Sequence, residues 1–202
     1  MKNSNIKIES EPGLKLNQDK QQVDFYVNGF LLIPCNDKNS LKNLLTFLSN
    51  EITKFNSGDR SKWKQTFGGA YDMVDDEMFI DFIKKNNLLE IVNSVSNQEY
   101  VLGDIKLRMW CPGDGYLNFH RDTYINKKGK IIGKIPPDIN VFFYPKLFYK
   151  KGKQLYLIEK SHRRDFDNFL IKFLMRFFEK RKVIYSNDDQ IVIFNSSILH
   201  GL

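Results

Sequence analysis

Residues 105–124 read IKLRMWCPGDGYLNFHRDTY, and this stretch decides the fold class. Its first seven residues alternate in the way of a β-strand, whose successive side chains point to opposite faces. One face would carry Ile105, Leu107, Met109 and Cys111, and the other Lys106, Arg108 and Trp110. Residues 112–115, Pro-Gly-Asp-Gly, are a strong turn signal, and residues 116–124 then read as a second strand.

Short strand candidates continue beyond this stretch, whereas helical periodicity precedes it. Strands are expected at 139–144, 154–159, 183–185 and 190–195, interrupted by one helix at about 165–181. Before residue 100 the pattern predicts helices at about 40–55 and 76–95, after an extended segment at 22–34. This order predicts a mainly β fold, a sandwich or jelly roll, with helices flanking one sheet.

The chain of 202 residues has the length of one domain. We expect a flexible N-terminal arm at 1–20 and a single domain at 21–202, because the first twenty residues are polar and unpatterned. No apolar run approaches the roughly 18 residues that span a bilayer, and no secretory signal is visible. The two cysteines, Cys35 and Cys111, are too few for a disulfide framework or a cysteine-based zinc site. We therefore expect a cytoplasmic protein without a membrane partner.

The net charge of +7 is concentrated between His120 and Lys182, where 17 lysines and arginines face 6 acidic residues. Such an excess favours an anionic partner, either a small phosphate- or carboxylate-bearing molecule or a nucleic acid. It is equally typical of a solubilising surface. No zinc-finger spacing or RNA-binding aromatic signature accompanies it, which argues against nucleic acid.

The sequence holds three histidines, His120, His162 and His200. His120 and Asp122 lie two positions apart on a predicted strand, so both side chains can reach one metal ion. A second histidine would complete the 2-His-1-carboxylate triad of non-haem Fe(II) oxygenases. His-x-Asp alone is a weak signal, and His200, which follows an apolar run, fits a core residue equally well.

Four segments, in order, resemble the phytanoyl-CoA dioxygenase-like family of Fe(II)/2-oxoglutarate-dependent oxygenases. Residues 25–33 resemble the family's N-terminal opening, and 112–122 resemble its metal-binding strand. Residues 152–163 resemble a strand that ends in Pro-Gly-Ser-His, although Glu159-Lys160 replaces Pro-Gly. Residues 188–201 resemble the strand of the distal histidine, with Asn187-Asp188 or Asp188-Asp189 standing for Gly-Asp.

The resemblance implies a double-stranded β-helix in which His120, Asp122 and His200 hold Fe(II). It also implies 2-oxoglutarate as cosubstrate, dioxygen, and hydroxylation of a small-molecule substrate. The excess of basic residues favours an anionic substrate. The iron would carry the catalysis, so no separate acid or base residue is expected. The family's arginine for 2-oxoglutarate follows the second histidine by about ten residues, but this sequence ends at Leu202. We therefore expect the last strand to be missing.

Other residues are candidates for binding the two organic molecules. Arg108, Trp110 and Asn118 are expected to contact 2-oxoglutarate, although Arg108 also fits a surface position on its strand. Trp63 and Phe67, from a loop at 56–71, are expected to line the substrate site together with His162 and Arg163. The loop could equally pack on the barrel. The alternative functions are a non-catalytic jelly-roll binding module, a truncated inactive oxygenase, and a basic nucleic-acid-binding protein.

Overall fold

The structure is a computed structural model. It describes residues 12–66, 71–73, 77–103, 105–109, 119–122, 138–145, 155–163, 180–185 and 189–201. Its helices are α1 (Pro12–Asn28), α2 (Lys38–Asn56), α3 (Glu77–Lys85) and α4 (Leu88–Ser96), with a short 3₁₀ turn at Ser161–Arg163. Residues 165–179 of the helix expected at 165–181, and most of the strand expected at 116–124, lie outside the described residues. The expected end of that helix is wrong, because Lys180 is not helical and Arg181 begins a strand.

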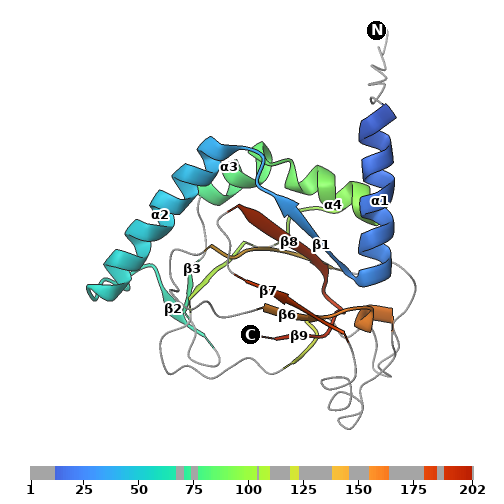
Figure 1. The fold of residues 1–202 in the computed structure, drawn as a ribbon. Coiled ribbons are helices and arrows are strands. Elements are labelled where there is room, and N and C mark those ends of the chain that lie inside the picture. Colours follow the sequence, from blue (N-terminus) through green and yellow to red (C-terminus); the bar gives the residue numbers. More distant parts are fainter. Residues whose placement is uncertain are drawn as a thin grey trace, which may run out of the picture.

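The described strands form three small antiparallel sheets (Figure 1). The first has the order β1-β8-β5 and is built from β1 (Phe30–Pro34), β8 (Gln190–Asn195) and β5 (Ile139–Phe143). The second, β7-β6-β9, contains β7 (Arg181–Ile184), β6 (Leu155–Ile158) and β9 (His200–Gly201). The third, β2-β3-β4, contains β2 (Lys64–Gln65), β3 (Tyr71–Met73) and β4 (Leu107–Met109).

Strand β8 lies between two apolar layers, and its alternation assigns each side chain to one of them. Ile191 and Ile193 pack with the helices, whereas Val192 and Phe194 pack with Leu155 and Leu157 of β6 and their neighbours. A strand that is buried on both faces is expected to be continuously apolar, as β8 is. In Figure 1, α2, α3 and α4 lie on one side of β1 and β8, and the sheet β7-β6-β9 lies on the other. His200 belongs to this sheet, as the cross-strand partner of Leu157 on β6.

The third sheet packs beside the end of α2. Phe55, Trp63 and Met73 form a small buried cluster, with Tyr71, Leu107 and Met109 against it. The loop expected at 56–71 therefore contributes its tryptophan to a packed core. Within this sheet Leu107 and Met109 are half-buried and Arg108 is exposed, so the predicted alternation of this strand is confirmed.

The prediction of an extended chain over 22–34 is wrong for residues 22–28, which form the last turns of α1. Residues 12–20, expected in the flexible arm, are its first half. The apolar residues Val23, Phe25 and Val27 alternate as in a strand, but α1 packs along α4 and buries Phe25. Gly29 ends the helix with φ +85°, and its N–H donates to Phe25 O at 2.8 Å. A glycine in the left-handed region is a common helix C-terminus.

The single helix expected at 76–95 is two helices, α3 and α4, because the chain breaks at Asn86 and Asn87. Asn87 has φ 52°, a left-handed conformation that asparagine tolerates better than most residues. The buried Asn86 side chain accepts from the N–H groups of Asn36 and Asp37 and donates to Phe82 O. The amide therefore ties α3 to the start of α2, which local periodicity cannot reveal.

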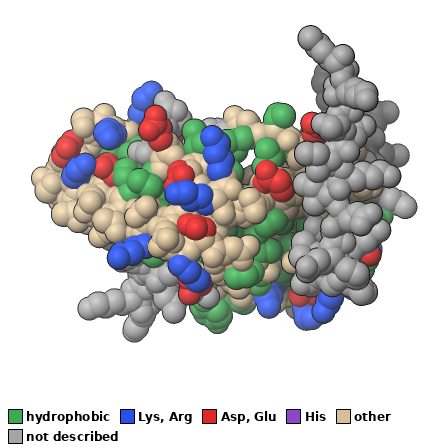
Figure 2. All heavy atoms as spheres, turned by 90° about the horizontal axis from the view of Figure 1, so that it is seen from above, with side chains coloured by type: hydrophobic (Ala, Val, Ile, Leu, Met, Phe, Trp, Pro, Cys, Tyr) green, Lys and Arg blue, Asp and Glu red, His purple; other side chains and the backbone are tan. Residues whose placement is uncertain are grey.

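The remaining predicted strands at 139–144, 154–159 and 190–195 match β5, β6 and β8, and β7 overlaps the strand expected at 183–185. The two facing sheets and the covering helices agree with the coarse prediction of flanked antiparallel β-structure. A closed double-stranded β-helix stays a prediction. No helix within the described ranges is long and apolar enough to cross a membrane. Acidic and basic side chains are interspersed on the face seen from above the helices (Figure 2).

Candidate metal centre

His120 and His200 face each other across an isolated antiparallel bridge. The N–H of His120 donates to His200 O at 2.8 Å, and the N–H of His200 donates to His120 O at 2.9 Å. The backbone pairing brings the two imidazole rings to a centroid distance of 4.4 Å. Two residues that are 80 positions apart in the sequence are therefore neighbours because of a strand pairing that includes both.

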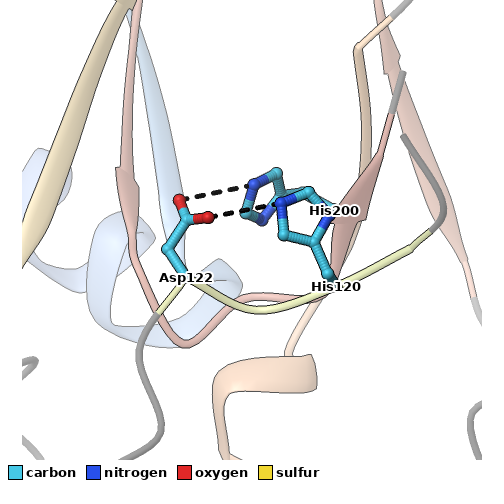
Figure 3. A group of neighbouring side chains, drawn as sticks. All are labelled: His120, Asp122 and His200. Atoms are coloured by element: carbon cyan, nitrogen blue, oxygen red, sulfur yellow. Dashed lines mark ion pairs between the residues drawn. The ribbon is translucent and has the colours of Figure 1, made fainter. Parts of the chain in front are cut away.

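Asp122 joins the two histidines from the same short segment as His120 (Figure 3). Its N–H donates to Ser196 O at 3.0 Å, which anchors the segment to the turn after β8. Asp122 Oδ1 lies 3.3 Å from His120 Nε2, and Asp122 Oδ2 lies 3.5 Å from His200 Nε2. The three ligand atoms all lie within 4.8 Å of one another. Adjacent ligands of an ion bound at about 2.1 Å are about 3 Å apart, so small side-chain rotations suffice to bind one ion.

His200 presents the nitrogen that a metal requires. Its Nδ1 lies 3.0 Å from Ile198 O, and a carbonyl only accepts, so Nδ1 carries the proton. The lone pair is therefore on Nε2, the atom that faces Asp122. Burial lowers the pKa of His200, against the opposing charge of Asp122, so the imidazole is neutral at neutral pH. A backbone partner on the second ring nitrogen is the usual way to orient a ligating histidine.

Asp122 is ionised under the same conditions. Burial by itself would raise the pKa of this carboxyl, but the hydrogen bond from His120, the charges of both histidines and a hydrogen bond from Asn140 lower it overall. Asn140 Nδ2, on β5, lies 2.6 Å from Asp122 Oδ2. Two imidazoles, of which that of His200 is neutral, and one carboxylate form a donor set that suits a divalent transition metal and leaves other coordination positions open.

Ser161 connects the two segments that carry the ligands. Its carbonyl accepts from Arg121, the residue between His120 and Asp122, at 3.0 Å. Its hydroxyl oxygen accepts from the N–H of Leu199, the residue before His200, at 2.7 Å. All three residues are buried. One serine therefore helps to fix the positions of both metal-binding segments.

The other predicted site residues have separate environments. Arg108 forms a bidentate ion pair with the buried carboxylate of Asp72, at 2.8 and 3.0 Å, across the β3–β4 register. Trp63 packs edge-on against Phe55 in the small cluster beside α2. Phe67, Trp110 and Asn118 lie outside the described residues.

His162 and Arg163 meet the end of α1. His162 Nε2 lies 3.0 Å from Tyr26 O, and the Arg163 guanidinium stacks over the Tyr26 ring at 4.5 Å. Burial, together with the positive charges of Arg163 and Arg121, lowers the pKa of His162 to about 4 in spite of its backbone hydrogen bond. His162 is therefore a neutral, buried contact between α1 and the turn that contains Ser161.

Sequence reasoning missed Asn140 and the bridging role of Ser161. Asn140 does leave a signal, because an asparagine inside the apolar run Ile139–Phe143 is unusual for a strand. Ser161 leaves none, since its two hydrogen bonds reach residues about 40 positions away.

Comparison with solved structures relates this arrangement to known proteins. HygX from Streptomyces hygroscopicus, crystallised with nickel, 2-oxoglutarate and hygromycin B, superposes with a TM-score of 0.63 at 14% identity, over 90% of this chain and 79% of that one. The non-heme alpha ketoglutarate dependent carbocyclase SnoK from nogalamycin biosynthesis gives 0.63 at 9% identity, over 90% and 76%. EctD from S. alaskensis with bound Fe gives 0.64 at 13% identity, over 90% and 69%.

This chain has the fold of these proteins. No protein-family model matches the sequence, and no curated protein matches it. The shared fold accounts for the order of helices and strands in the described residues. The candidate metal centre rests on the geometry of His120, Asp122 and His200 in this chain itself.

Proposed function

We propose that this protein is an Fe(II)- and 2-oxoglutarate-dependent oxygenase, of the phytanoyl-CoA dioxygenase-like branch, with His120, Asp122 and His200 as its metal ligands. The observation that carries the proposal is the convergence of these side chains, which come from two distant segments. The fold it shares with proteins crystallised with iron, or with nickel and 2-oxoglutarate, supports it.

The protonation states of the residues fit a bound divalent iron. His200 offers a neutral Nε2, and Asp122 offers an ionised carboxylate that hydrogen bonds already orient. Bound iron would supply the oxidation in which a substrate C–H bond, dioxygen and 2-oxoglutarate give a C–OH group, carbon dioxide and succinate. The backbone bridge between His120 and His200 holds the two imidazoles together without a metal, so the chain contributes a partly preorganised site.

Arg108 remains the proposed contact of 2-oxoglutarate among the described residues. Its side chain is 43% exposed, and the charge of Asp122 contributes to raising its pKa, after the hydrogen bond and charge of Asp72. Asp72 binds Nε and one terminal nitrogen, so a dicarboxylate would have to use the other donors of the guanidinium. We expect Arg108→Gln to raise KM for 2-oxoglutarate while metal affinity stays unchanged.

The proposed substrate is a small molecule, and the basic residues of the C-terminal half favour an anionic one. Roles for Trp63, His162 and Arg163 in lining its site stay predictions. The packing of Trp63 against Phe55 and of His162 against α1 gives each of these side chains a structural role as well.

The experiment that tests the proposal measures succinate formed from 2-oxoglutarate, Fe(II) and dioxygen. The assay is run without a primary substrate, so it does not depend on the identity of that substrate. We expect succinate from the unaltered chain and none above background from His120→Ala. Lys42→Ala, on the exposed face of α2, is the matched control and should behave like the unaltered chain.

Two outcomes would count against the proposal. Equal succinate formation by His120→Ala and the unaltered chain would show that His120 holds no catalytic metal. Stoichiometric Fe(II) binding without succinate formation would instead favour the non-catalytic binding module.

A further inference from the structure

The Asp122 carboxylate has a third close polar neighbour besides the two histidines, the Asn140 side chain. Asn140 Nδ2 lies 2.6 Å from Asp122 Oδ2, the oxygen that also lies 3.5 Å from His200 Nε2. An ionised carboxylate only accepts hydrogen bonds, so the amide nitrogen of Asn140 must be the donor. A hydrogen bond to a charged acceptor is among the stronger ones in proteins.

Asn140 reaches this position from a well-defined place in the central sheet. It lies within β5 and is the cross-strand partner of Phe194 on β8. The Phe194 ring lies 5.0 Å from the His200 ring, so the same pair of strands contacts both Asp122 and His200. The residues before and after Asn140 also pair with β8, which fixes the backbone of Asn140. The side chain therefore extends from a fixed position.

We propose that Asn140 is a positioning residue of the metal centre, whose amide holds the Asp122 carboxylate in the orientation that faces His120 and His200. The inference rests on the proposed function, because a positioning role presupposes a metal at these three residues. It assigns Asn140 no contact with the metal or with either organic substrate.

Asp122 needs such a support more than His200 does. His200 is held by its ring hydrogen bond to Ile198 O and is almost fully buried, whereas the Asp122 side chain is 39% exposed. Water can therefore compete for the carboxylate. Hydrogen-bond partners that orient metal ligands change metal affinity by about 10- to 100-fold when they are removed.

The test compares metal binding by the full chain with binding by Asn140→Leu, which has a similar size but no donor. Asn140→Ala serves as a second variant if leucine impairs folding. Val141→Ala, at the next position of the same strand with an exposed side chain, is the control for disturbance of β5. Fe(II) affinity is measured by anaerobic titration, and the visible absorption of bound Co(II) reports the ligand geometry. Thermal unfolding of the metal-free variants measures any structural effect.

We expect Asn140→Leu to bind Fe(II) about 10- to 100-fold more weakly, with altered Co(II) absorption bands, while Val141→Ala stays within twofold of the unaltered chain. A purely structural role would lower the unfolding temperature and leave the Co(II) bands unchanged, which would overturn the inference. Unchanged affinity in both Asn140 variants would overturn it as well and leave the proposed function intact. Absence of metal binding by the unaltered chain would defeat both.

Discussion

At the scale of single residues, Gly29 lies directly against the His162 ring. A Cβ atom at Gly29 would clash with His162 Nδ1, and the glycine has φ +85°. The imidazole in turn donates from Nε2 to Tyr26 O. The end of α1 and the turn at Ser161–Arg163 therefore fit together only because residue 29 has no side chain.

We expect Gly29→Ala to destabilise the fold more than Gly58→Ala does. Both glycines have a positive φ, which costs about 1–3 kcal/mol for a residue with a Cβ, but Gly58 has no atom within 4 Å of the added methyl group. Gly29→Ala adds overpacking of about 1–3 kcal/mol. Urea unfolding of the two variants measures the difference, and equal losses would show that His162 accommodates the methyl group.

His162 also makes stability depend on pH. Its pKa in the folded chain is about 4, below the ordinary value of 6.5. The unfolded chain therefore binds more protons between these values, and stability falls as pH decreases from 6.5 to 4, by about 3 kcal/mol for this group. Above pH 6.5 the contribution is constant.

The variant His162→Gln removes this titration and keeps an amide donor for Tyr26 O. We expect its free energy of unfolding to change less between pH 4.5 and 6.5 than that of the unaltered chain. Urea titrations at several pH values in this range provide the comparison. The same pH slope in both proteins would mean that His162 is not buried in its neutral form.

At the scale of elements, Ser161 in the turn after β6 forms hydrogen bonds to both segments that contain the candidate metal ligands. We expect Ser161→Ala to cost about 1–3 kcal/mol, because the buried N–H of Leu199 loses its acceptor. The variant should also bind metal more weakly, since Leu199 precedes His200.

Ser197→Ala is the matched control for this change. Ser197 is equally buried, but its hydroxyl has no hydrogen-bond partner among the described residues, so its removal should be nearly neutral. Chemical unfolding and Fe(II) titration of both variants test the pair. A similar small effect at both serines would show that the hydrogen bonds of Ser161 do not fix the metal-binding segments.

Most elements could be predicted where one local pattern dominates. The helical spacing of the leucines predicts a helix at α2, and the short apolar run predicts a strand at β8. Both predictions are confirmed. Residues 22–28 fit both the alternation of a strand and the spacing of a helix. They form a helix, which packs against α4. The break between α3 and α4 depends on hydrogen bonds of Asn86 to residues 36 and 37, which no local window contains.

The candidate site was predictable to the same degree. His120 and Asp122 follow from strand alternation within three residues, and His200 follows from the resemblance to a known family. Asn140 and Ser161 act through partners at least 18 positions away, so only the folded chain brings them into view. Arg108 was recognised as a cation on the polar face of its strand, but its pairing with Asp72 requires the sheet register.

At the scale of the whole molecule, a bound metal would join the segment at 119–122 to β9. A ligand that binds only the folded chain stabilises it, by about 2.7 kcal/mol at a concentration 100 times its Kd. We therefore expect Ni²⁺ at that excess to raise the unfolding temperature by roughly 5–10 °C for a chain of this size. Asp122→Ala should show no rise, and a chelator should reverse the effect. An equal rise in both proteins would place the bound nickel elsewhere.

The central claim is that His120, Asp122 and His200 bind one divalent metal ion. The most direct measurement is the number of Fe(II) ions bound per chain, titrated without oxygen, for the unaltered protein and for alanine variants at the three positions. The account predicts one ion for the unaltered chain and none bound with comparable affinity by any variant. Retention of one tightly bound ion after either histidine is replaced would contradict it.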